Sequence, residues 1–393
     1  MHAKLAHLSI AQVTELITRY YKGEEKIQDL ISEYAIDVRP SGLVGLFPPV
    51  VHDDLLCAYC PDTKLQSKRE SRTGYSFIRP ACPKCKHENK ISCWCSNCQK
   101  ESNLRRQTEG ERKRELIVAA HGGKNQAVPL EELTLKDALY LVSLSRHSLS
   151  EDLKYVDPYS DEIRPDLAPP KLLSEIVSHL YRRRLIGVDI DSRIDAFTFD
   201  DKVTHTPSFY LAKVNWIFLP GLDMHEKIAY LRSLEDMAKS SWKPSWLDSS
   251  NEEWRLISKH ECLEYFQFLL SQRGYELDEI GEKTHAVFDS LLADYSVAQI
   301  FSLTWQAVRD TTDYIVKNNL PKYHGKNIFI GAVQRKADKF RAEGWEARNA
   351  RRDFECPQTV VSATFFNLFL QLGNAAFETV VPRLPPPPIA NAS

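Results

Sequence analysis

The stretch that decides the organisation of this chain is CPKCKHENKISCWCSNC, residues 82–98. It holds five cysteines and one histidine within seventeen residues. Another pair, Cys57 and Cys60, lies upstream, so seven of the nine cysteines fall between residues 57 and 98. A secreted disulfide scaffold would spread its cysteines over a small domain, so this clustering favours an intracellular metal site.

The spacing of these cysteines is that of metal ligands. The chain has three pairs separated by two residues, and a single thiol just before the third: Cys57 with Cys60, Cys82 with Cys85, Cys95 with Cys98, and Cys93. Each pair can close a tight turn in which both thiolates face one ion, and two pairs with 21 residues between them are typical of a zinc ribbon. Together with His87 the donors number eight, which is enough for two tetrahedral zinc ions.

The ligand partition stays open at this level. The first four cysteines can hold one ion and His87, Cys93, Cys95 and Cys98 the other, or the first pair can be cross-braced with the last. His52 could replace His87, and one zinc with three spare thiols is a further alternative. Protein donors leave no open coordination position, so we expect one or two structural Zn²⁺ ions. A redox role would need a thioredoxin-like βαβ pattern, which the sequence lacks.

Residues 1–50 are expected to form a small helical unit. Ser9 and Gln12 have the spacing of a capping box, and apolar residues follow at helical intervals. A second helix is predicted at 25–34 and a third at about 40–47, before a Pro-Pro stop. This succession of three short helices resembles a helix-turn-helix in which the third helix is the recognition helix. The alternative is a plain helical cap on the metal module.

The chain beyond the cysteine module (51–100) divides by composition. Residues 101–129 are predicted to be a charged connector that is either helical or flexible. The region 130–220 shows a helix that Thr134 can cap, a proline-rich loop, and a second helix ending in basic residues. A β-hairpin is expected within 187–201 and a strand within 208–220, and this order of elements resembles a winged helix.

The remaining sequence is predicted to be helical. Residues 221–381 contain five segments of helical periodicity, with Gly274, Gly344 and Gly373 where helices should end. Residues 382–393 are expected to be a disordered Pro-rich tail. The fold class predicted for the whole chain is therefore α+β, multidomain and mainly α.

Length and charge limit the function classes. A chain of 393 residues suggests two or three domains. Its formal net charge is -2, so any nucleic-acid binding must come from local basic patches. No secretory signal and no apolar run long enough for a membrane span is visible, so we expect a cytoplasmic protein that does not bind membranes.

Basic residues gather beside the predicted modules. Phosphate neutralisation needs such clusters on one face, although any one of them could also be a solvated surface. The candidate nucleic-acid contacts are Arg39, Lys64, Lys68, Arg69, Arg72, Arg105, Arg106, Arg182, Arg183 and Arg184.

Signals for catalysis are weak, and no catalytic residue is assigned. No phosphate-binding loop, dinucleotide fingerprint, zinc-protease motif or nucleophile elbow occurs. Asp310 and Asp313 share a predicted helix, but a surface salt-bridge face explains them. The sequence therefore leaves enzymatic activity undecided and favours a protein that is not an enzyme.

The combination of modules resembles bacterial-type DNA-binding proteins that join a zinc ribbon to helix-turn-helix and winged-helix units. Such proteins select transposition targets or regulate mobile elements and defence against phage. The resemblance implies DNA as the partner, with RNA as an alternative, and a C-terminal helical region that binds a protein or self-associates. A protein-interaction adaptor and an enzyme with its site in that region are the competing hypotheses.

Overall fold

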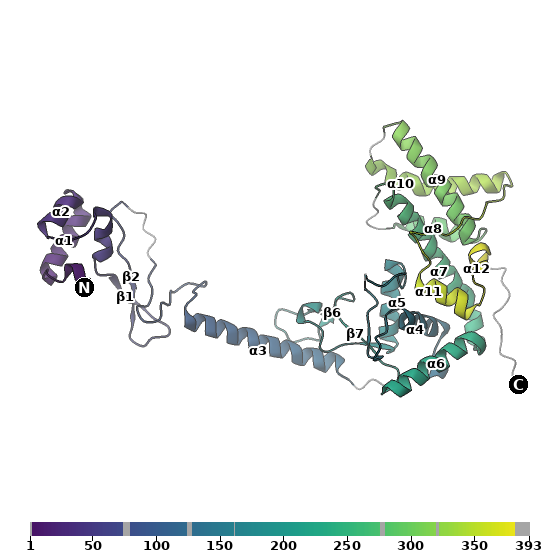
Figure 1. Ribbon diagram of the computed structural model, residues 1–393, viewed down its shortest axis with the longest axis horizontal. Helices are drawn as coiled ribbons and strands as arrows, with labels where there is room; N and C mark the ends of the chain where they lie inside the picture. Colours follow the sequence, from purple (N-terminus) through teal and green to yellow (C-terminus); the bar gives the residue numbers. More distant parts are fainter. Residues whose placement is uncertain are drawn as a thin grey trace. The chain divides into compact units, whose positions relative to one another are not determined.

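The computed structural model describes residues 2–73, 79–123, 128–160, 162–275, 280–319 and 322–381. It divides the chain into two compact units, Met1–Arg112 and Lys113–Ser393 (Figure 1). The described residues are mainly helical and carry small sheets, as predicted for the fold class. Helix α3 (Ser96–His121) begins in the first unit and ends in the second. The predicted Pro-rich tail lies outside the described residues.

The first unit opens with short helices around their own apolar cluster, which includes Leu16, Tyr20 and Leu30. These are η1 (Ala3–Leu5), α1 (Ile10–Lys22), α2 (Ile27–Glu33) and η2 (Pro40–Leu46). The capping box of Ser9 and Gln12 is confirmed at the start of α1. The third helix differs from the prediction, because η2 is a 3₁₀-helix. Two glycines among its seven residues disfavour a longer α-helix.

The cysteine module is built on an antiparallel hairpin. Strand β1 (Val50–Leu56) pairs with β2 (Lys64–Ser67), and the register shifts between His52 and Leu56. Ala81 extends this ladder through isolated bridges to Gln66 and Glu88. The predicted charged connector is helical over residues 101–121, since α3 starts inside the cysteine module and runs for 26 residues to His121.

The second unit begins with two helices packed beside a three-stranded antiparallel sheet. The helices are α4 (Leu135–Ser148), whose Thr134 cap is confirmed, and α5 (Pro170–Arg182). In the sheet, β7 (Trp216–Phe218) lies between β3 (Tyr155–Val156) and β4 (Ile186–Val188). A short second ladder joins β5 (Phe197–Thr198) to β6 (Ser208–Phe209).

The hairpin predicted within 187–201 is therefore wrong. Its two candidate strands, β4 and β5, do not pair with each other but take partners from the later segment, β7 and β6. That segment, expected to be one strand, is extended only at its two ends. Alternation along the chain identified extended residues but could not identify their partners, because pairing is decided by packing.

The rest of the second unit is helical, as predicted. Its elements are α6 (Met224–Ser240), α7 (Pro244–Ser271), α8 (Glu282–Leu291), α9 (Val297–Lys317), α10 (Lys322–Ala342), α11 (Val360–Ala363), the π-helical turn η5 (Thr364–Phe369) and α12 (Ala375–Glu378). The predicted helix stops Gly274, Gly344 and Gly373 all have positive φ, which glycine adopts without strain. Helix α8 was not among the predicted segments.

Helix α7 connects two apolar clusters within the second unit. Its first half, with Trp246 and Trp254, packs against α4, α6 and η5. Its second half, with Phe266 and Leu270, packs against α8 and α9. Among the described residues, no helix has the length and apolar character that a membrane crossing requires. The finer domain boundaries predicted from the sequence remain predictions.

Candidate metal centre

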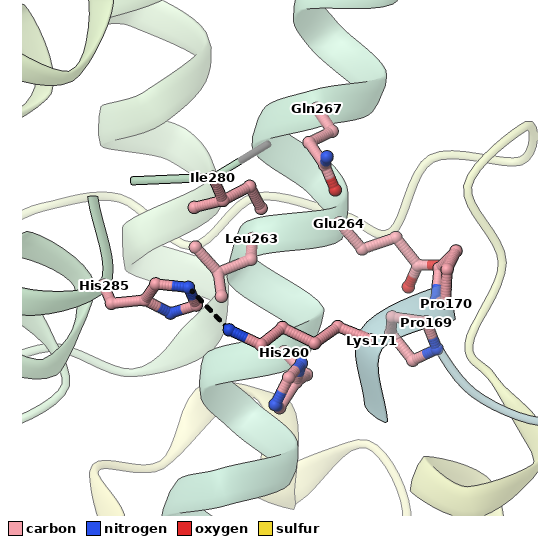
Figure 2. Close-up of a pocket in the computed structure, with 9 residues that line it drawn as sticks. All are labelled: Pro169, Pro170, Lys171, His260, Leu263, Glu264, Gln267, Ile280 and His285. Carbon is pink, nitrogen blue, oxygen red and sulfur yellow. Dashed lines mark hydrogen bonds between the residues drawn. The ribbon is translucent and has the colours of Figure 1, made fainter. Parts of the chain in front are cut away.

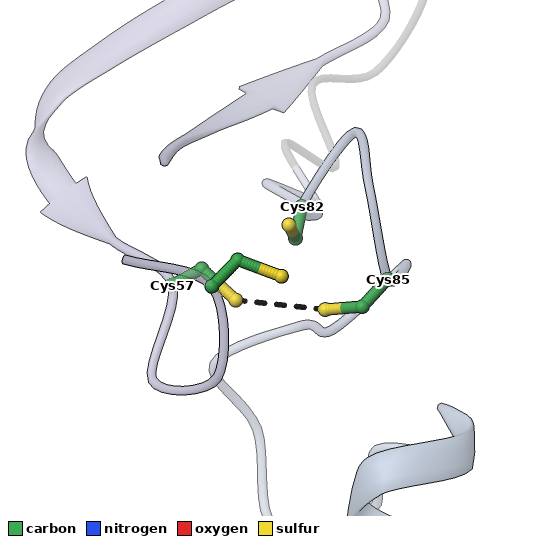
Figure 3. Close-up of side chains that lie close together, drawn as sticks. Cys57, Cys82 and Cys85 are labelled. Carbon is green, nitrogen blue, oxygen red and sulfur yellow. Dashed lines mark hydrogen bonds between the residues drawn. The ribbon is translucent and has the colours of Figure 1, made fainter. Parts of the chain in front are cut away.

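The first candidate centre joins two cysteine pairs from separate loops. Cys57 and Cys60 follow strand β1, and Cys82 and Cys85 come from the loop that follows β2 along the chain. One sulfur from each of the four lies within 4.8 Å of the others. Figure 3 shows Cys57, Cys82 and Cys85 pointing toward one another, with the Cys57 and Cys85 sulfurs 3.6 Å apart. A disulfide bond would require an S–S distance of about 2.05 Å, so Cys57 and Cys85 are separate thiols.

The second candidate centre lies at the start of α3. His87, Cys93, Cys95 and Cys98 place one donor atom each within 4.8 Å of one another. The Nδ1 atom of His87 is 3.3 Å from the Cys98 sulfur and 3.8 Å from the Cys95 sulfur. The donors thus group in the first of the two predicted partitions, without cross-bracing. His52 is not in either group, because its Nε2 contacts the Ser67 hydroxyl.

Both groups fit a tetrahedral zinc ion. Zn–S bonds of about 2.3 Å and Zn–N bonds of about 2.0 Å place tetrahedral donors roughly 3.5–3.8 Å apart. The distances of 3.3, 3.6 and 3.8 Å between donor atoms lie close to that range. The first group would hold an ion through four thiolates and the second through three thiolates and an imidazole. With all positions filled by protein, such ions would be structural.

Backbone amides around the turns are placed to stabilise thiolates. The amide of Tyr59 donates to the Cys57 sulfur at 3.4 Å, and that of Cys98 donates to the Cys95 sulfur at 3.4 Å. After the second cysteine pair, Lys86 has a φ of 62°, and its amide donates to the Cys82 carbonyl. This left-handed residue turns the chain so that His87 reaches the second group.

The thiol pKa values within the first group diverge. Burial alone would raise the pKa of Cys82, but the amides of Cys85 and Lys84 lower it to about 6. Burial, with the neighbouring thiols, raises the pKa of Cys85 to about 12. One thiolate forms easily while its neighbour resists ionisation. A divalent cation supplies the positive charge that would ionise the whole set.

Tyr59 is the residue at this centre that sequence reasoning missed. It lies inside the first cysteine pair, yet its hydroxyl contacts the Cys98 sulfur of the second group at 3.5 Å and donates to the Glu101 carboxylate. Its ring also packs edge-on against the His87 imidazole. Tyr59 therefore links the two groups. An aromatic residue between paired cysteines was the available signal, but only the fold reveals its target.

The apolar core of the cysteine module is small. Its buried cluster consists of Leu65 together with the ligand cysteines Cys57 and Cys82. So few apolar contacts cannot offset the conformational entropy lost when about fifty residues are ordered. Metal coordination would supply the stability that this small core lacks.

The predicted nucleic-acid contacts fall into two sets. Five are exposed and make no side-chain hydrogen bond or ion pair within the described part of the chain: Arg39, Lys68, Arg105, Arg106 and Arg184. The other five have internal partners. Lys64 pairs with Asp53, Arg69 donates to the Pro48 carbonyl, Arg72 to the Tyr20 and Glu25 carbonyls, Arg182 to the Ser178 carbonyl, and Arg183 to the Asp137 carboxylate.

Of the two acidic residues considered for catalysis, Asp310 takes part in surface ion pairs. Asp310 forms ion pairs with Arg309 at 2.8 Å and Lys336 at 2.9 Å, so the predicted surface salt-bridge face is present at this residue. These cations hold the pKa of Asp310 below its usual value, although burial opposes them. A carboxylate neutralised in this way is a poor general base.

Comparisons with known proteins give one relative and no function. No protein-family model and no solved structure matches the chain. Over 56 residues, 14% of this chain and 68% of the relative, the chain is 34% identical to an uncharacterized protein of Rickettsia conorii. The chain therefore belongs to the same family as that protein, whose name states no activity, ligand or partner.

Proposed function

We propose that this chain is a zinc-dependent DNA-binding protein with a regulatory role or a role in mobile elements or phage defence. The observation that carries the proposal is a basic groove beside the first cysteine group. Zinc is the proposed metal, because four thiolates, or three thiolates and an imidazole, in a tetrahedron are its usual structural donors. Thiolates of this kind persist in a reducing compartment, so we propose the cytoplasm.

The groove lies within the first unit and has a volume of about 780 Å³. Residues of η2 form one side, and the cysteine module forms the other. Four basic side chains line it, against one carboxylate, Glu70: Lys68, Arg69, Arg79 and Lys86. A concave surface with this excess of positive charge attracts a phosphate backbone even though the whole chain is slightly acidic.

Elements of each unit support known modes of DNA docking. Helices α1 and α2 with η2 follow the order of a helix-turn-helix, although η2 is shorter than a usual recognition helix. In the second unit, β3 lies between α4 and α5 in the chain, and β7 pairs with both β3 and β4, an arrangement in keeping with a winged helix. The exposed Arg105 and Arg106 on α3 could add phosphate contacts.

A salt titration of DNA binding tests the proposal. Fluorescence anisotropy with a 20-base-pair duplex should give a logarithmic affinity that falls linearly with log salt concentration. The double variant K68Q/K86Q should weaken binding and reduce the magnitude of that slope by about 2. The matched variant K239Q/K283Q, with exposed lysines of α6 and α8, should leave the slope unchanged. Absence of binding would refute the proposal, salt-independent binding would refute the role of the basic groove, and a preference for an RNA duplex would assign RNA instead.

A protein-interaction adaptor is the second candidate, favoured by exposed apolar residues on the cysteine module. Ile91 is fully exposed. Trp94, which lies between Cys93 and Cys95 of the second group, is 80% exposed. Exposed apolar side chains on a rigid loop are typical of protein contacts. The C-terminal helical region could bind a partner or self-associate through α9, where Tyr314 and Val316 are exposed. Loss of a co-purifying protein in W94S, with DNA binding absent, would favour the adaptor.

A further inference from the structure

A pocket of about 430 Å³ lies within the second unit, where the start of α5 meets α7 and α8. Figure 2 shows the side chains that line it, with Lys171 of α5 reaching across α7 toward His285 of α8. The Lys171 Nζ atom is 3.4 Å from the His285 Nε2 atom. Leu263 and Ile280 provide apolar walls. Pockets of this size hold ligands of nucleotide or drug size.

The Lys171 ammonium in this pocket has no carboxylate within ion-pair distance among the described residues. Lys171 makes no ion pair with a carboxylate in the described ranges of the chain, in contrast to Lys259 nearby, whose Nζ atom is 2.6 Å from Asp289. A lysine is usually stabilised by a neighbouring carboxylate, whereas the hydrogen-bonding neighbour of the Lys171 ammonium is the imidazole of His285. The pocket, which His260 and His285 both line, therefore offers a cation and two ring donors to an incoming anion.

Backbone amide groups at the start of α5 add to the positive potential in the pocket. Helix α5 begins at Pro170, and its N-cap, Pro169, provides no side-chain cap. The amides of Lys171 and Leu172 have no acceptor in the described structure, since the first turn closes with the Leu173 amide on the Pro169 carbonyl. Free first-turn amides and the helix dipole together make such an end a binding site for phosphate groups.

A buried histidine provides independent evidence that the pocket is built for a polar ligand. His260 lines the pocket, its residue is only 6% exposed, and no side-chain hydrogen bond satisfies its ring among the described residues. Burial, together with the adjacent Lys259, His285 and Lys171, lowers the pKa of His260 to about 4. A neutral imidazole of this kind can donate one hydrogen bond to a ligand oxygen.

We propose that this pocket binds a small phosphorylated molecule of about the size of a mononucleotide. Its phosphate would lie at the start of α5, between Lys171, His260 and His285, and its remaining part would lie against Leu263 and Ile280. Gln267 and Glu264 line the same pocket and would contact the polar groups of that part. This site is independent of the metal centre and of the proposed DNA groove.

Glu264 gives the site a pH dependence. Burial, reinforced by the charge of Glu261, raises the pKa of Glu264 to about 7, while Arg352 opposes the shift. Glu264 is thus mostly neutral at pH 6 and mostly ionised at pH 8, where it would repel an anion. The other charged and titratable groups around the pocket, or around the hollow that adjoins it at Glu264, are Lys171, Glu175, His260, His285, Lys259, Asp289, Arg164, Asp166, Glu355 and Cys356.

Calorimetric titration of the full chain tests this proposal. Adenosine monophosphate should bind at pH 7, and adenosine, which lacks the phosphate, should bind at least tenfold more weakly. The variant K171A should lose about tenfold in affinity for the monophosphate. K283A removes an exposed lysine of α8 outside the pocket and should bind like the wild type.

A second variant, E264Q, is expected to raise the affinity for an anion, whereas K171A lowers it. With sulfate as the probe, whose charge is constant between pH 6 and 8, E264Q should tighten binding several-fold at pH 8 and change little at pH 6. A purely structural role of Lys171 and Glu264 would weaken binding in both variants. The proposal is overturned by absence of monophosphate binding, by K171A binding like the wild type, by weaker sulfate binding in E264Q, or by loss of DNA affinity in K171A.

Discussion

Among single residues, Asp137 has a buried carboxylate whose negative charge is stabilised by several donors. Its side chain is fully buried, and its carboxylate accepts hydrogen bonds from His179 at 2.6 Å, from the Thr134 amide at 2.9 Å, and from Arg183 at 3.1 Å. Burial alone would raise its pKa, but these donors lower it to about 2. Arg183, whose contact with nucleic acid stays a prediction, forms an ion pair with this carboxylate.

The variant D137N should therefore destabilise the second unit in a pH-dependent way. The folded pKa of Asp137 lies below its unfolded value of about 3.8, so the stability it contributes is present above that value and is lost as pH falls toward 2. We expect a loss of about 2 kcal/mol at pH 7 and a smaller one near pH 2.5, measured by urea unfolding. D195N, in an exposed ion pair with Arg193, is the control and should leave the midpoint unchanged. An equal loss at both pH values would contradict the assignment.

Among the long helices, α3 has little packing to stabilise it. Of its 26 residues only Ile117 is buried, so most of its stability must come from backbone propensity and from attachment at its ends. Cys98 attaches the first turn to the second metal group, and the Arg114 side chain donates to the Ile190 and Ser192 carbonyls near the other end.

Two glycines of this region should respond oppositely to alanine. A Cβ atom on Gly110 would meet no atom within 4 Å, so G110A should stabilise α3 by about 0.5–1 kcal/mol through lower unfolded-state entropy. A Cβ atom on Gly122 would lie 2.6 Å from the Val118 carbonyl oxygen, so G122A should destabilise the helix end. Amide hydrogen exchange across α3 measures both. Faster exchange in G110A would show that this helix is limited by something other than its backbone.

Local signals in the sequence predicted elements better than their partners. The capping boxes at Ser9 and Thr134 depend only on residues within one turn, so the starts of α1 and α4 could be read directly. The eight metal donors could also be identified directly from the sequence, because their spacing is typical of zinc ligands. The partition of those donors, the contact of Tyr59 with Cys98 and the pairing of β4 with β7 depend on segments far apart in sequence, which no local pattern encodes.

For the whole molecule, the two units should differ in their dependence on metal. The second unit has two apolar clusters of its own, whereas the cysteine module has a minimal core around Leu65. Coordination in small zinc modules contributes about 10–16 kcal/mol, which is more than the net stability of most domains. Removing metal should therefore unfold the module without unfolding the second unit.

Chelation of the purified full chain checks this expectation. A colorimetric chelator should release two zinc ions per chain, and hydrogen exchange should then rise to unprotected levels over the module and the first turn of α3, with α4 and α7 still protected. C57S and C93S should each lower the zinc content to one ion, because each removes a donor from a different group. C356S changes a cysteine outside both groups and should retain two ions. A single ion in the wild type, or loss of protection in α7 on chelation, would show that the two groups do not act as separate centres confined to the first unit.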